Sequence, residues 1–501
     1  MKDMSFHRIA IINRGEPAMR LIRAVRDWNA EGRPPLETVA LFTAVDKNAP
    51  YVLEADYSRE LGAPAEDGQD EVARARTCYL DYDGLIAAMK ATGADAAWPG
   101  WGFVSEHPDF AERCREAGIT FIGPTPEAMR RVGDKIGSKR LAESAQVPVA
   151  PWSGGPVASP EEALAKAASI GFPLLVKATA GGGGRGIRFV SSAEALPDAL
   201  RSASEEAQKA FGDGTVFLEA MVSAARHVEV QVLADDHDQV WAVGVRDCTA
   251  QRSHQKVIEE APSAVLSPEQ DRALREAAVR VTRASGYRNA GTAEFLFEPS
   301  TGAFCFMEMN ARLQVEHPVT EMTTGLDLVK LQIALALGEP LPSPEPPATR
   351  GHAIEVRLCA EDPDRGFAPA PGKVLAFRPP QGAGLRVDAG LREGNIIPQA
   401  FDSMVAKLIA MGSTREEARG RLLRGLQESL AVVEGGVTNR SFLIRLLEHP
   451  DFKDSRIDTS WIDRLVAQEG VGSKRWGGIA LVAVGILLHK ARLKEDEAHF
   501  F

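Results

Sequence analysis

The order of apolar positions in the first 120 residues predicts strands that alternate with helices. An apolar run at 8–12 (RIAII) precedes a segment with apolar residues at the spacing of a buried helix face, namely Ala18, Leu21, Ile22, Val25 and Trp28. Two further strand-like runs lie at 38–44 and 94–99. This order is typical of a β-α-β sheet covered by helices. The turn after the first strand has a single glycine, so the dinucleotide-binding fingerprint is missing.

The rest of the chain divides into a small and a large region. Residues 150–222 open in a proline- and glycine-rich stretch, contain a strand at 173–178 and continue into a glycine run, which predicts a small module. Residues 223–465 hold several strands and predict a larger mixed α/β region, with a surface loop at 339–347. We therefore expect five parts: an N-terminal α/β domain at 1–133, a connecting segment at 134–149, a small domain at 150–222, a C-terminal domain at 223–465 and a helical tail at 466–501.

Length and composition narrow the classes of protein that fit. A chain of 501 residues exceeds what one hydrophobic core supports, which agrees with about three main domains. The net charge of −11 argues against a general nucleic-acid binder, so an anionic substrate must meet local clusters of lysine and arginine. The 5 cysteines are scattered without a Cys-x-x-Cys pair, which favours a reducing cytoplasm and disfavours a zinc site.

Neither export nor insertion into a membrane is expected. The N-terminus lacks a basic region followed by an apolar stretch and a cleavage site. The apolar stretch at 476–488 is shorter than the roughly 20 residues that cross a bilayer, and we expect a buried or interface helix there. A cytoplasmic location follows from these patterns.

A glycine run is the strongest local signal in the chain. Residues 177–186 (KATAGGGGRG) follow a strand-like run, and the run contains Gly182, Gly183 and Gly184. Backbone N–H groups of consecutive glycines can approach phosphate oxygens closely, and Lys177 adds a positive charge. The segment is not a Walker A loop, because no Gly-Lys-Ser/Thr follows. We interpret it as a phosphate-covering loop, and a flexible linker is the alternative.

A predicted strand pair brings acidic residues together. The strands 291–297 and 303–310 flank a turn at 298–302, which places Glu294 and Glu308 on one face, about one diagonal step or 7 to 8 Å apart. Two carboxylates there can hold Mg²⁺ against phosphates. Polar residues follow at alternate positions up to Glu316, and an extended chain would aim them into one cleft. A solvated strand face is the alternative.

A third segment, at 246–256 (RDCTAQRSHQK), places polar and cationic residues between two apolar runs. This composition is unsuited to a hydrophobic core and suited to an anion site. A basic surface loop is the alternative interpretation.

Taken together, these segments resemble the biotin carboxylase family. The matching stretches occur in the family's order over residues 6–465, and their number makes a chance agreement negligible. They are INRGEPAMR (12–20), PGWGFVSE (99–106), GDKIGSK (133–139), VKATAGGGGRG (176–186), RHVEVQVLAD (226–235), RDCTAQRSHQKVIEEAP (246–262), GTAEFLF (291–297), MEMNARLQVEHPVTEM (307–322), GHAIEVRLCAEDP (351–363) and FDSMVAKL (401–408).

The resemblance implies an α/β (α+β) ATP-grasp fold, in which a glycine-rich lid closes over ATP. It implies ATP-binding residues at Lys135, Lys177, Gly182, Gly183, Gly184, Glu219 (with adenine), His227, Gln251, His254, Leu296 and Val437. It implies ligands for Mg²⁺ or Mn²⁺ at Glu294, Glu308 and Asn310. It implies a bicarbonate and biotin pocket of Lys256, Arg312, Gln314, Val315, Trp101 and Arg357.

The catalytic residues implied by the resemblance are Lys256, Arg312, Glu316 and Arg357. Glu316 would take the proton of bicarbonate as it attacks the γ-phosphate of ATP, which gives carboxyphosphate. Carboxyphosphate would break down to CO₂ and phosphate, and that phosphate would remove the N1′ proton of biotin. Arg357 would stabilise the enolate-like biotin. Two departures from relatives are Trp101, where many have tyrosine, and Ala180, where a glycine is usual.

Biotin is expected on another domain or protein. The sequence Ala-Met-Lys-Ala at 88–91 lies in a helical pattern, whereas a biotinylated lysine needs a tight hairpin. The expected partners are therefore a biotin carboxyl carrier and a carboxyltransferase. We also expect a homodimer, with Arg20, Arg23 and Asp27 on its surface, or a larger multidomain assembly. The tail at 466–501 is interpreted as a docking segment or the start of a further domain.

The final carboxyl acceptor has several candidates. An acyl-CoA is favoured over pyruvate and urea. Another ATP-grasp ligase, such as one of the carbamoyl-phosphate type, shares the lid and the metal carboxylates. A non-catalytic nucleotide-binding module is disfavoured, because every proposed catalytic residue is present.

Overall fold

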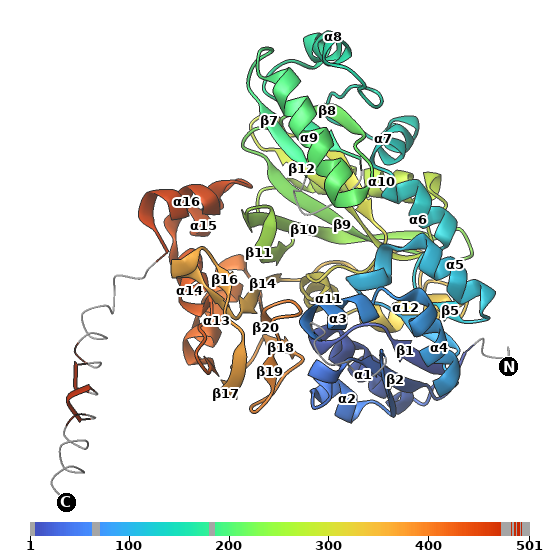
Figure 1. The fold of residues 1–501 in the computed structure, drawn as a ribbon, viewed down its shortest axis with the longest axis vertical. Coiled ribbons are helices and arrows are strands. Elements are labelled where there is room, and N and C mark those ends of the chain that lie inside the picture. Colours follow the sequence, from blue (N-terminus) through green and yellow to red (C-terminus); the bar gives the residue numbers. More distant parts are fainter. Residues whose placement is uncertain are drawn as a thin grey trace, which may run out of the picture.

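The computed structural model describes residues 6–62, 71–179 and 186–471, together with a few single positions nearer the C-terminus. The N-terminal part has a parallel sheet of five strands in the order β3-β2-β1-β4-β5, as the alternating pattern predicts (Figure 1). Its strands are β1 (Arg8–Ile11), β2 (Glu37–Phe42), β3 (Tyr57–Glu60), β4 (Ala96–Trp98) and β5 (Thr120–Phe121). The helices between them are α1 (Gly15–Ala30), α2 (Pro50–Glu54), α3 (Glu71–Cys78), α4 (Tyr82–Thr92) and α5 (Pro108–Glu116).

Helix α1 buries the apolar face that its sequence predicts, from Ala18 to Trp28. Helix α4 contains the Ala-Met-Lys-Ala sequence at 88–91, so this lysine is in a helix and not in a hairpin. All 5 cysteines are free thiols. None of the helices in the described part of the chain is both long enough and apolar enough to cross a membrane.

A small module follows the connecting helices α6 (Pro126–Gly133) and α7 (Lys135–Ser144). Its antiparallel sheet has the order β7-β6-β8, and helices α8 (Pro160–Ile170) and α9 (Leu196–Phe211) accompany it (Figure 1). The strands are β6 (Leu174–Ala178), β7 (Ile187–Val190) and β8 (Val216–Ala220). We call this module, residues 150–222, the lid module. Gly182, Gly183 and Gly184 lie outside the described residues.

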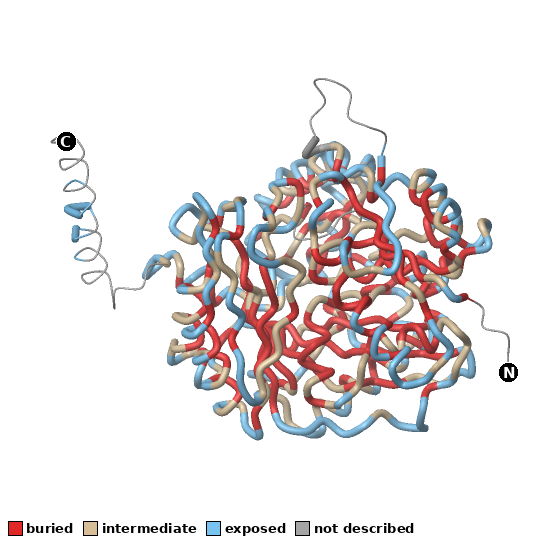
Figure 2. Tube along the Cα trace, turned by 90° about the horizontal axis from the view of Figure 1, so that it is seen from below, coloured by how far each residue is buried: buried red, intermediate tan, exposed pale blue. Residues whose placement is uncertain are grey.

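The large region is built on an eight-stranded antiparallel sheet, in the order β13-β12-β9-β10-β11-β14-β20-β18. Its strands are β9 (Arg226–Ala234), β10 (Val240–Arg252), β11 (Gln255–Ala261), β12 (Asn289–Glu298), β13 (Ala303–Asn310), β14 (His352–Cys359), β18 (Leu385–Ala389) and β20 (Met404–Gly412). The helices that pack with it include α10 (Pro268–Ala284), α11 (His317–Thr324), α12 (Leu328–Ala336) and α13 (Arg415–Glu428). Residues 339–347 form an irregular connection, as predicted. Figure 2 shows that the buried residues lie in the interior and the exposed residues around it.

The C-terminal part of this region has smaller elements. They are β15 (Glu361–Asp362), β16 (Ala368–Pro369), β17 (Gly372–Arg378), β19 (Ile396–Ile397), β21 (Leu430–Val433), α14 (Arg440–Glu448), α15 (Pro450–Lys453) and α16 (Trp461–Glu469). Residues from α13, α14 and α16 share one apolar core with the outer half of the large sheet.

The segment 246–256 is not a basic surface loop, and that alternative is wrong. It forms the end of β10 and the start of β11, joined by a tight turn at Ser253 and His254, which both have positive φ. Arg246, Asp247 and Thr249 are buried in the strand. These polar residues are inside the sheet because charged partners on neighbouring strands compensate them.

Arg20 is not part of an exposed surface for a second subunit. Its side chain is buried and pairs with Glu321 at 2.8 Å and with Asp327 at 2.7 Å, so α1 is fixed to the large region. The spacing of α1 could not distinguish this buried arginine from the exposed Arg23 and Asp27. A homodimer therefore stays a prediction that rests on these exposed residues alone.

Glu260 on β11 connects the large sheet to α13. Its carboxylate lies 2.8 Å from His352 Nε2 and accepts a hydrogen bond from Arg415 Nε at 2.6 Å. Burial raises the pKa of Glu260, but His352 and Arg415 outweigh burial and lower this pKa to about 2. A carboxyl group with a lowered pKa in the folded chain stabilises the fold above its unfolded pKa. This contribution is lost as the pH falls towards the folded pKa.

Glu260→Gln is expected to lower the free energy of unfolding at pH 7 by about 2 to 4 kcal/mol, because the Arg415 guanidinium loses its counter-ion. The difference from wild type should shrink as the pH falls below the unfolded value of 4.5, because the carboxylate then takes up a proton in the unfolded chain while it stays ionised in the folded chain. Urea unfolding between about pH 7 and pH 3 measures both effects. Glu276→Gln, at an exposed position of α10, is the control. A difference that does not change with pH would contradict this role of Glu260.

Candidate active site

Lys256 lies at the centre of a buried cluster of charged side chains. Its Nζ is 2.6 Å from Glu229, 3.0 Å from Glu294 and 2.6 Å from Glu316. Burial lowers the pKa of Lys256, but the three carboxylates raise it well above its ordinary value. Lys256 is therefore a fixed positive charge at the predicted bicarbonate position.

Glu316 is fully buried beside two cations. It occupies the N-cap position of α11, with Lys256 at one carboxylate oxygen and Arg357 Nη2 at 3.0 Å from the other. Burial raises the pKa of Glu316, but Lys256, Arg357 and Arg246 lower it well below its ordinary value. The side chain is thus ionised, which is the form that a general base requires. Both of its carboxylate oxygens thus have a cationic partner.

Arg357 reaches this cluster from β14. It also donates to Glu259 at 2.7 Å, and its backbone carbonyl accepts a hydrogen bond from Asn439 at 3.0 Å. Asn439 lies just beyond Val437, an exposed residue in the loop between β21 and α14. The loop that contains the predicted nucleotide contact Val437 is therefore attached to the strand that holds Arg357.

The register of β12 and β13 differs from the prediction. Glu294 and Glu308 are direct cross-strand partners and not diagonal neighbours. A β-bulge beside Glu294 shifts the pairing, so that Phe295 pairs with Phe306 and Met307 has no partner. The prediction counted residues outward from the turn, and such a count cannot reveal a bulged residue.

The adjacent carboxylates suit a divalent cation. Burial and the neighbouring Glu294 both raise the pKa of Glu308, which makes no hydrogen bond or ion pair with the described residues. Asn310 follows on the same strand, and its Oδ1, the atom that could ligate a cation, accepts a long hydrogen bond from Arg312 at 3.4 Å. A bound Mg²⁺ would relieve the repulsion between the two carboxylates, so the residues present fit a metal site.

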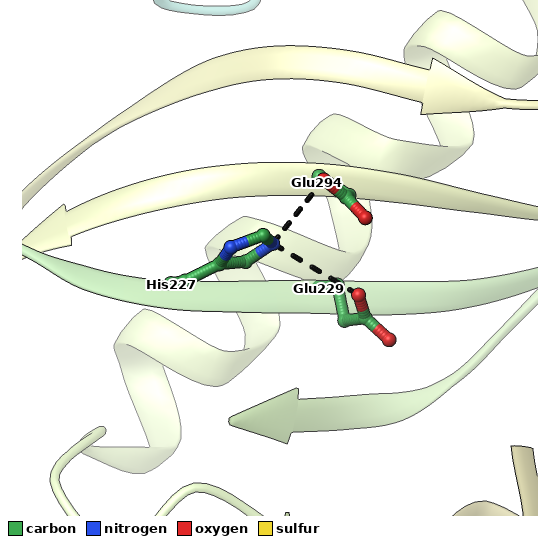
Figure 3. A group of neighbouring side chains, drawn as sticks. All are labelled: His227, Glu229 and Glu294. Atoms are coloured by element: carbon green, nitrogen blue, oxygen red, sulfur yellow. Dashed lines mark ion pairs between the residues drawn. The ribbon is translucent and has the colours of Figure 1, made fainter. Parts of the chain in front are cut away.

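His227, Glu229 and Glu294 form a second acidic group (Figure 3). His227 Nε2 lies 3.2 Å from Glu294 and 4.0 Å from Glu229, and its Nδ1 lies 2.7 Å from Gln251. Lys256 already compensates both carboxylates of this group, and Arg246 pairs with Glu229 at 2.5 Å. We therefore interpret the group as part of the cation network and place the metal at Glu294 and Glu308.

The segment after β13 only partly follows the predicted alternation. Arg312 pairs with Glu106 at 3.0 Å, and Gln314 donates to Glu294 at 2.9 Å. The strand ends at Asn310, and a turn at 315–316 leads into α11. Consequently Val315 is only half-buried, and its carbonyl accepts a hydrogen bond from Lys407 at 2.8 Å. The continuous extended segment expected up to Glu316 is wrong because the chain bends at 311–312 and turns at 315–316, directly before α11.

Trp101 is buried behind this turn. Its ring lies 5.1 Å from the His317 ring and 4.9 Å from Lys407 Nζ, measured from the ring centre. The ring therefore packs against the first residue of α11, which follows Glu316 in the chain.

The predicted nucleotide residues lie on both sides of the cleft. Lys177 on β6 pairs with Glu219 on β8 at 2.7 Å, and Lys135 on α7 donates to the Ala178 carbonyl at 3.4 Å. Leu296 on β12 is half-buried. His254 is exposed in the β10–β11 turn and makes no hydrogen bond or ion pair with any described residue.

Four residues of the cluster were not among the predicted site residues: Glu106, Glu229, Arg246 and Glu259. Glu229 and Arg246 are fully buried and directly paired across β9 and β10. A charged residue within an otherwise apolar strand, as in RHVEVQVLAD at 226–235, is a signal that would have found Glu229.

A lid module, an adjacent pair of carboxylates and a cation network on an antiparallel sheet are the arrangement of an ATP-grasp ligase. Family models agree along the chain: "Biotin carboxylase, N-terminal domain" matches residues 5–129, "Carbamoyl-phosphate synthase L chain, ATP binding domain" matches 134–344 and "Biotin carboxylase C-terminal domain" matches 355–464.

Individual proteins support the same assignment. Biotin carboxylase 1 of Bacillus subtilis is 41% identical over 457 residues, which cover 91% of this chain and 98% of that protein. A biotin carboxylase of Nostoc is 42% identical over 463 residues, which cover 92% of this chain and 100% of that protein. The solved biotin carboxylase of Campylobacter jejuni has a TM-score of 0.86 at 40% identity, covering 92% of this chain and 99% of that one. This chain belongs to the biotin carboxylase family, and it is an ATP-dependent ligase that forms a carbon–nitrogen bond.

Glu308→Gln is expected to weaken the binding of Mn²⁺, in the presence of a non-hydrolysable ATP analogue, by at least about tenfold. The thermal stability should not fall, because the change removes a like charge beside Glu294. Electron paramagnetic resonance of Mn²⁺ measures binding, and calorimetry measures stability. Glu298→Gln, at the turn end of β12, is the control. Unchanged Mn²⁺ affinity in Glu308→Gln would contradict the assignment of this ligand.

Proposed function

We propose that this chain uses ATP and bicarbonate to carboxylate biotin that is carried on a separate domain or protein. The observation that carries the proposal is the convergence of Glu316, Lys256 and Arg357 within hydrogen-bonding distance, beside the carboxylate that also faces Glu308. A base, two fixed cations and a metal site in one place fit the reaction of a small anion with a nucleotide.

Bicarbonate would compete with the carboxylates of this network for its cations. An anion that binds Lys256 and Arg312 draws positive charge away from Glu316, whose pKa then rises towards that of an effective base. Glu316 accepts the proton of bicarbonate, and a bicarbonate oxygen attacks the γ-phosphorus of ATP. The products are ADP and carboxyphosphate.

Lys135 and Lys177 hold the phosphates of ATP and stabilise the charge that develops during transfer. Glu294, Glu308 and Asn310 would hold Mg²⁺ or Mn²⁺, which neutralises charge on the phosphate oxygens. Closure of the lid module excludes water, which matters because carboxyphosphate hydrolyses readily.

Carboxyphosphate divides into CO₂ and phosphate, and the phosphate removes the N1′ proton of biotin. The biotin nitrogen then attacks CO₂, which forms the carbon–nitrogen bond. Arg357 is placed to stabilise the negative charge on the ureido oxygen, because its guanidinium is already fixed by Glu259 and Glu316. Trp101 shapes the back of the site through its contacts with His317 and Lys407.

The carboxyl acceptor of the complete reaction is proposed to be an acyl-CoA. Relatives with about 40% identity include an acyl-coenzyme A carboxylase subunit of Mycobacterium leprae and a methylcrotonoyl-CoA carboxylase subunit of rice. A solved neighbour with 38% identity is the biotin carboxylase domain of a 2-oxoglutarate carboxylase from Hydrogenobacter thermophilus, in complex with MgADP and bicarbonate. A panel of acyl-CoAs, pyruvate, 2-oxoglutarate and urea, assayed with the native carrier and carboxyltransferase, distinguishes these acceptors.

A cytoplasmic location, a homodimer, and partnership with a biotin carrier and a carboxyltransferase complete the proposal. These partners follow from the absence of a carrier hairpin at 88–91 and from the names of the relatives, several of which are subunits. The competing assignment is a ligase of the carbamoyl-phosphate type, which shares the family model over 134–344.

Incubation with ATP, Mg²⁺, labelled bicarbonate and free biotin should produce labelled carboxybiotin. ADP formation should depend on both bicarbonate and biotin. Glu316→Ala and Arg357→Ala should each lower the rate of carboxybiotin formation by at least about 100-fold, because each removes a group that acts in the transition state. Biotin-independent turnover, or full activity in both variants, would contradict the proposed reaction.

The tail at 466–501 is proposed to dock on a partner or to lead into a further domain. It lies mostly outside the described residues, and Val482, Ile486 and Leu488 are exposed apolar residues within it. Removal of residues 472–501 should leave free-biotin turnover unchanged and should weaken assembly with the native carrier and carboxyltransferase. Unchanged assembly in analytical ultracentrifugation would contradict this proposal.

A further inference from the structure

One buried carboxylate in the nucleotide cleft has two lysine partners. Glu219 on β8 pairs with Lys177 on β6 at 2.7 Å through one oxygen and with Lys139 on α7 through the other. Glu219 and Lys139 are 5% and 3% exposed, so water contributes little to their solvation. A single carboxylate needs only one buried counter-ion, and the second lysine therefore requires an explanation.

The two lysines come from different parts of the molecule. Lys177 lies on β6, the strand that leads into the glycine run at 181–184. Lys139 lies on α7, which packs against β13 and α10 of the large region. Lys135 lies one turn before Lys139 on the same helix face. Thus Lys139 belongs to a helix that packs on the large region, and Lys177 belongs to the lid module itself.

The surplus of positive charge fits an incoming polyphosphate. Lys177 and Lys139 pair with Glu219, and Cys305 on β13 also lies near it. Lys135 interacts with Glu308 more strongly than with Glu219. When Lys177 turns to the phosphates of ATP, Glu219 keeps one counter-ion, and the pair with Lys139 is neutral. Without Lys139, the same movement would leave a buried carboxylate without a partner, which is costly.

We propose that Lys139 is a positioning residue of the nucleotide site: it is the permanent counter-ion of Glu219, and it keeps this carboxylate ionised and oriented for adenine while Lys177 serves the phosphates. The inference rests on the proposed function, because it uses the assignment of Glu219 to adenine. Lys139 acts through Glu219 and does not touch the reacting atoms.

The role of Lys139 has a consequence for the choice between adenine and guanine nucleotides. An ionised Glu219 accepts a hydrogen bond from the 6-amino group of adenine and repels the 6-oxo group of guanine. Burial raises the pKa of Glu219, while Lys177 and Lys139 hold it below its ordinary value. Loss of Lys139 therefore favours the protonated acid, which can donate to the oxygen of guanine.

The test uses Lys139→Met, Lys139→Gln and Lys139→Arg in the full chain, with Lys166→Met on the exposed side of α8 as the matched control. Equilibrium binding of ATP and GTP is measured by calorimetry, and KM and kcat are measured with free biotin. Lys139→Met and Lys139→Gln should lower the preference for ATP over GTP by about tenfold or more, and they should raise KM for ATP more than they lower kcat. Lys139→Arg should keep the preference, because it keeps the charge. Lys166→Met should behave as wild type.

Affinity for ATP in Lys139→Gln should also improve as the pH rises from about 6 to 8.5, since Glu219 then loses its proton, whereas wild type should change little over this range. An unchanged ATP preference in Lys139→Met and Lys139→Gln would overturn the proposal, and so would equal losses in Lys139→Arg and Lys139→Gln. Binding does not require carboxylation. A wild type that binds ATP and lacks bicarbonate- and biotin-dependent turnover would therefore contradict the proposed function and not the role of Lys139.

Discussion

The ammonium group of Lys256 determines the arrangement of the active site. It meets three carboxylates that come from β9, β12 and the turn before α11. Charges in a protein interior are tolerated only when they are paired, so these segments must lie at the distances that the ion pairs allow. Arg246 and Arg357 compensate the remaining negative charge on Glu229 and Glu316. The network therefore holds the base in place before any substrate is bound.

A second layer of charges connects this network to the N-terminal part. Burial raises the pKa of Glu355 well above its ordinary value, and the nearby Glu259 raises it further. Lys407 lowers this pKa but does not outweigh burial. Burial likewise raises the pKa of Glu16 to about 7, although Lys407, whose Nζ lies 3.0 Å from the Glu16 carboxylate, lowers it. Lys407 is thus a shared cation between α1 and the large sheet, and it also holds the carbonyl of Val315 directly before the base. The position of Glu316 consequently depends on contacts in both parts of the molecule.

How far the sequence predicted this structure depends on the range of the interactions. The helix face from Ala18 to Trp28 and the strand pair around 298–302 follow from local periodicity, and both were confirmed. The predicted diagonal offset between Glu294 and Glu308 was wrong, because one bulged residue alters the register and makes them direct partners. The burial of Arg20 and the partner of Arg312 depend on residues that are 200 to 300 positions away along the chain, such as Glu321 and Glu106. No local pattern contains that information, and the resemblance to a family supplied the rest of the site.

The two ends of the cleft carry opposite charge, and this polarity suits one molecule that spans both. At the lid end, Lys139 and Lys177 both pair with the single carboxylate of Glu219, and Lys135 lies between Glu219 and Glu308. At the sheet end, Glu308 has no ion pair among the described residues and lies beside Glu294, so negative charge is in excess there. A metal nucleotide has the complementary distribution, because its phosphates need cations and its metal needs carboxylates. Neither end is fully compensated alone. A metal nucleotide bound as proposed would therefore neutralise both ends at once.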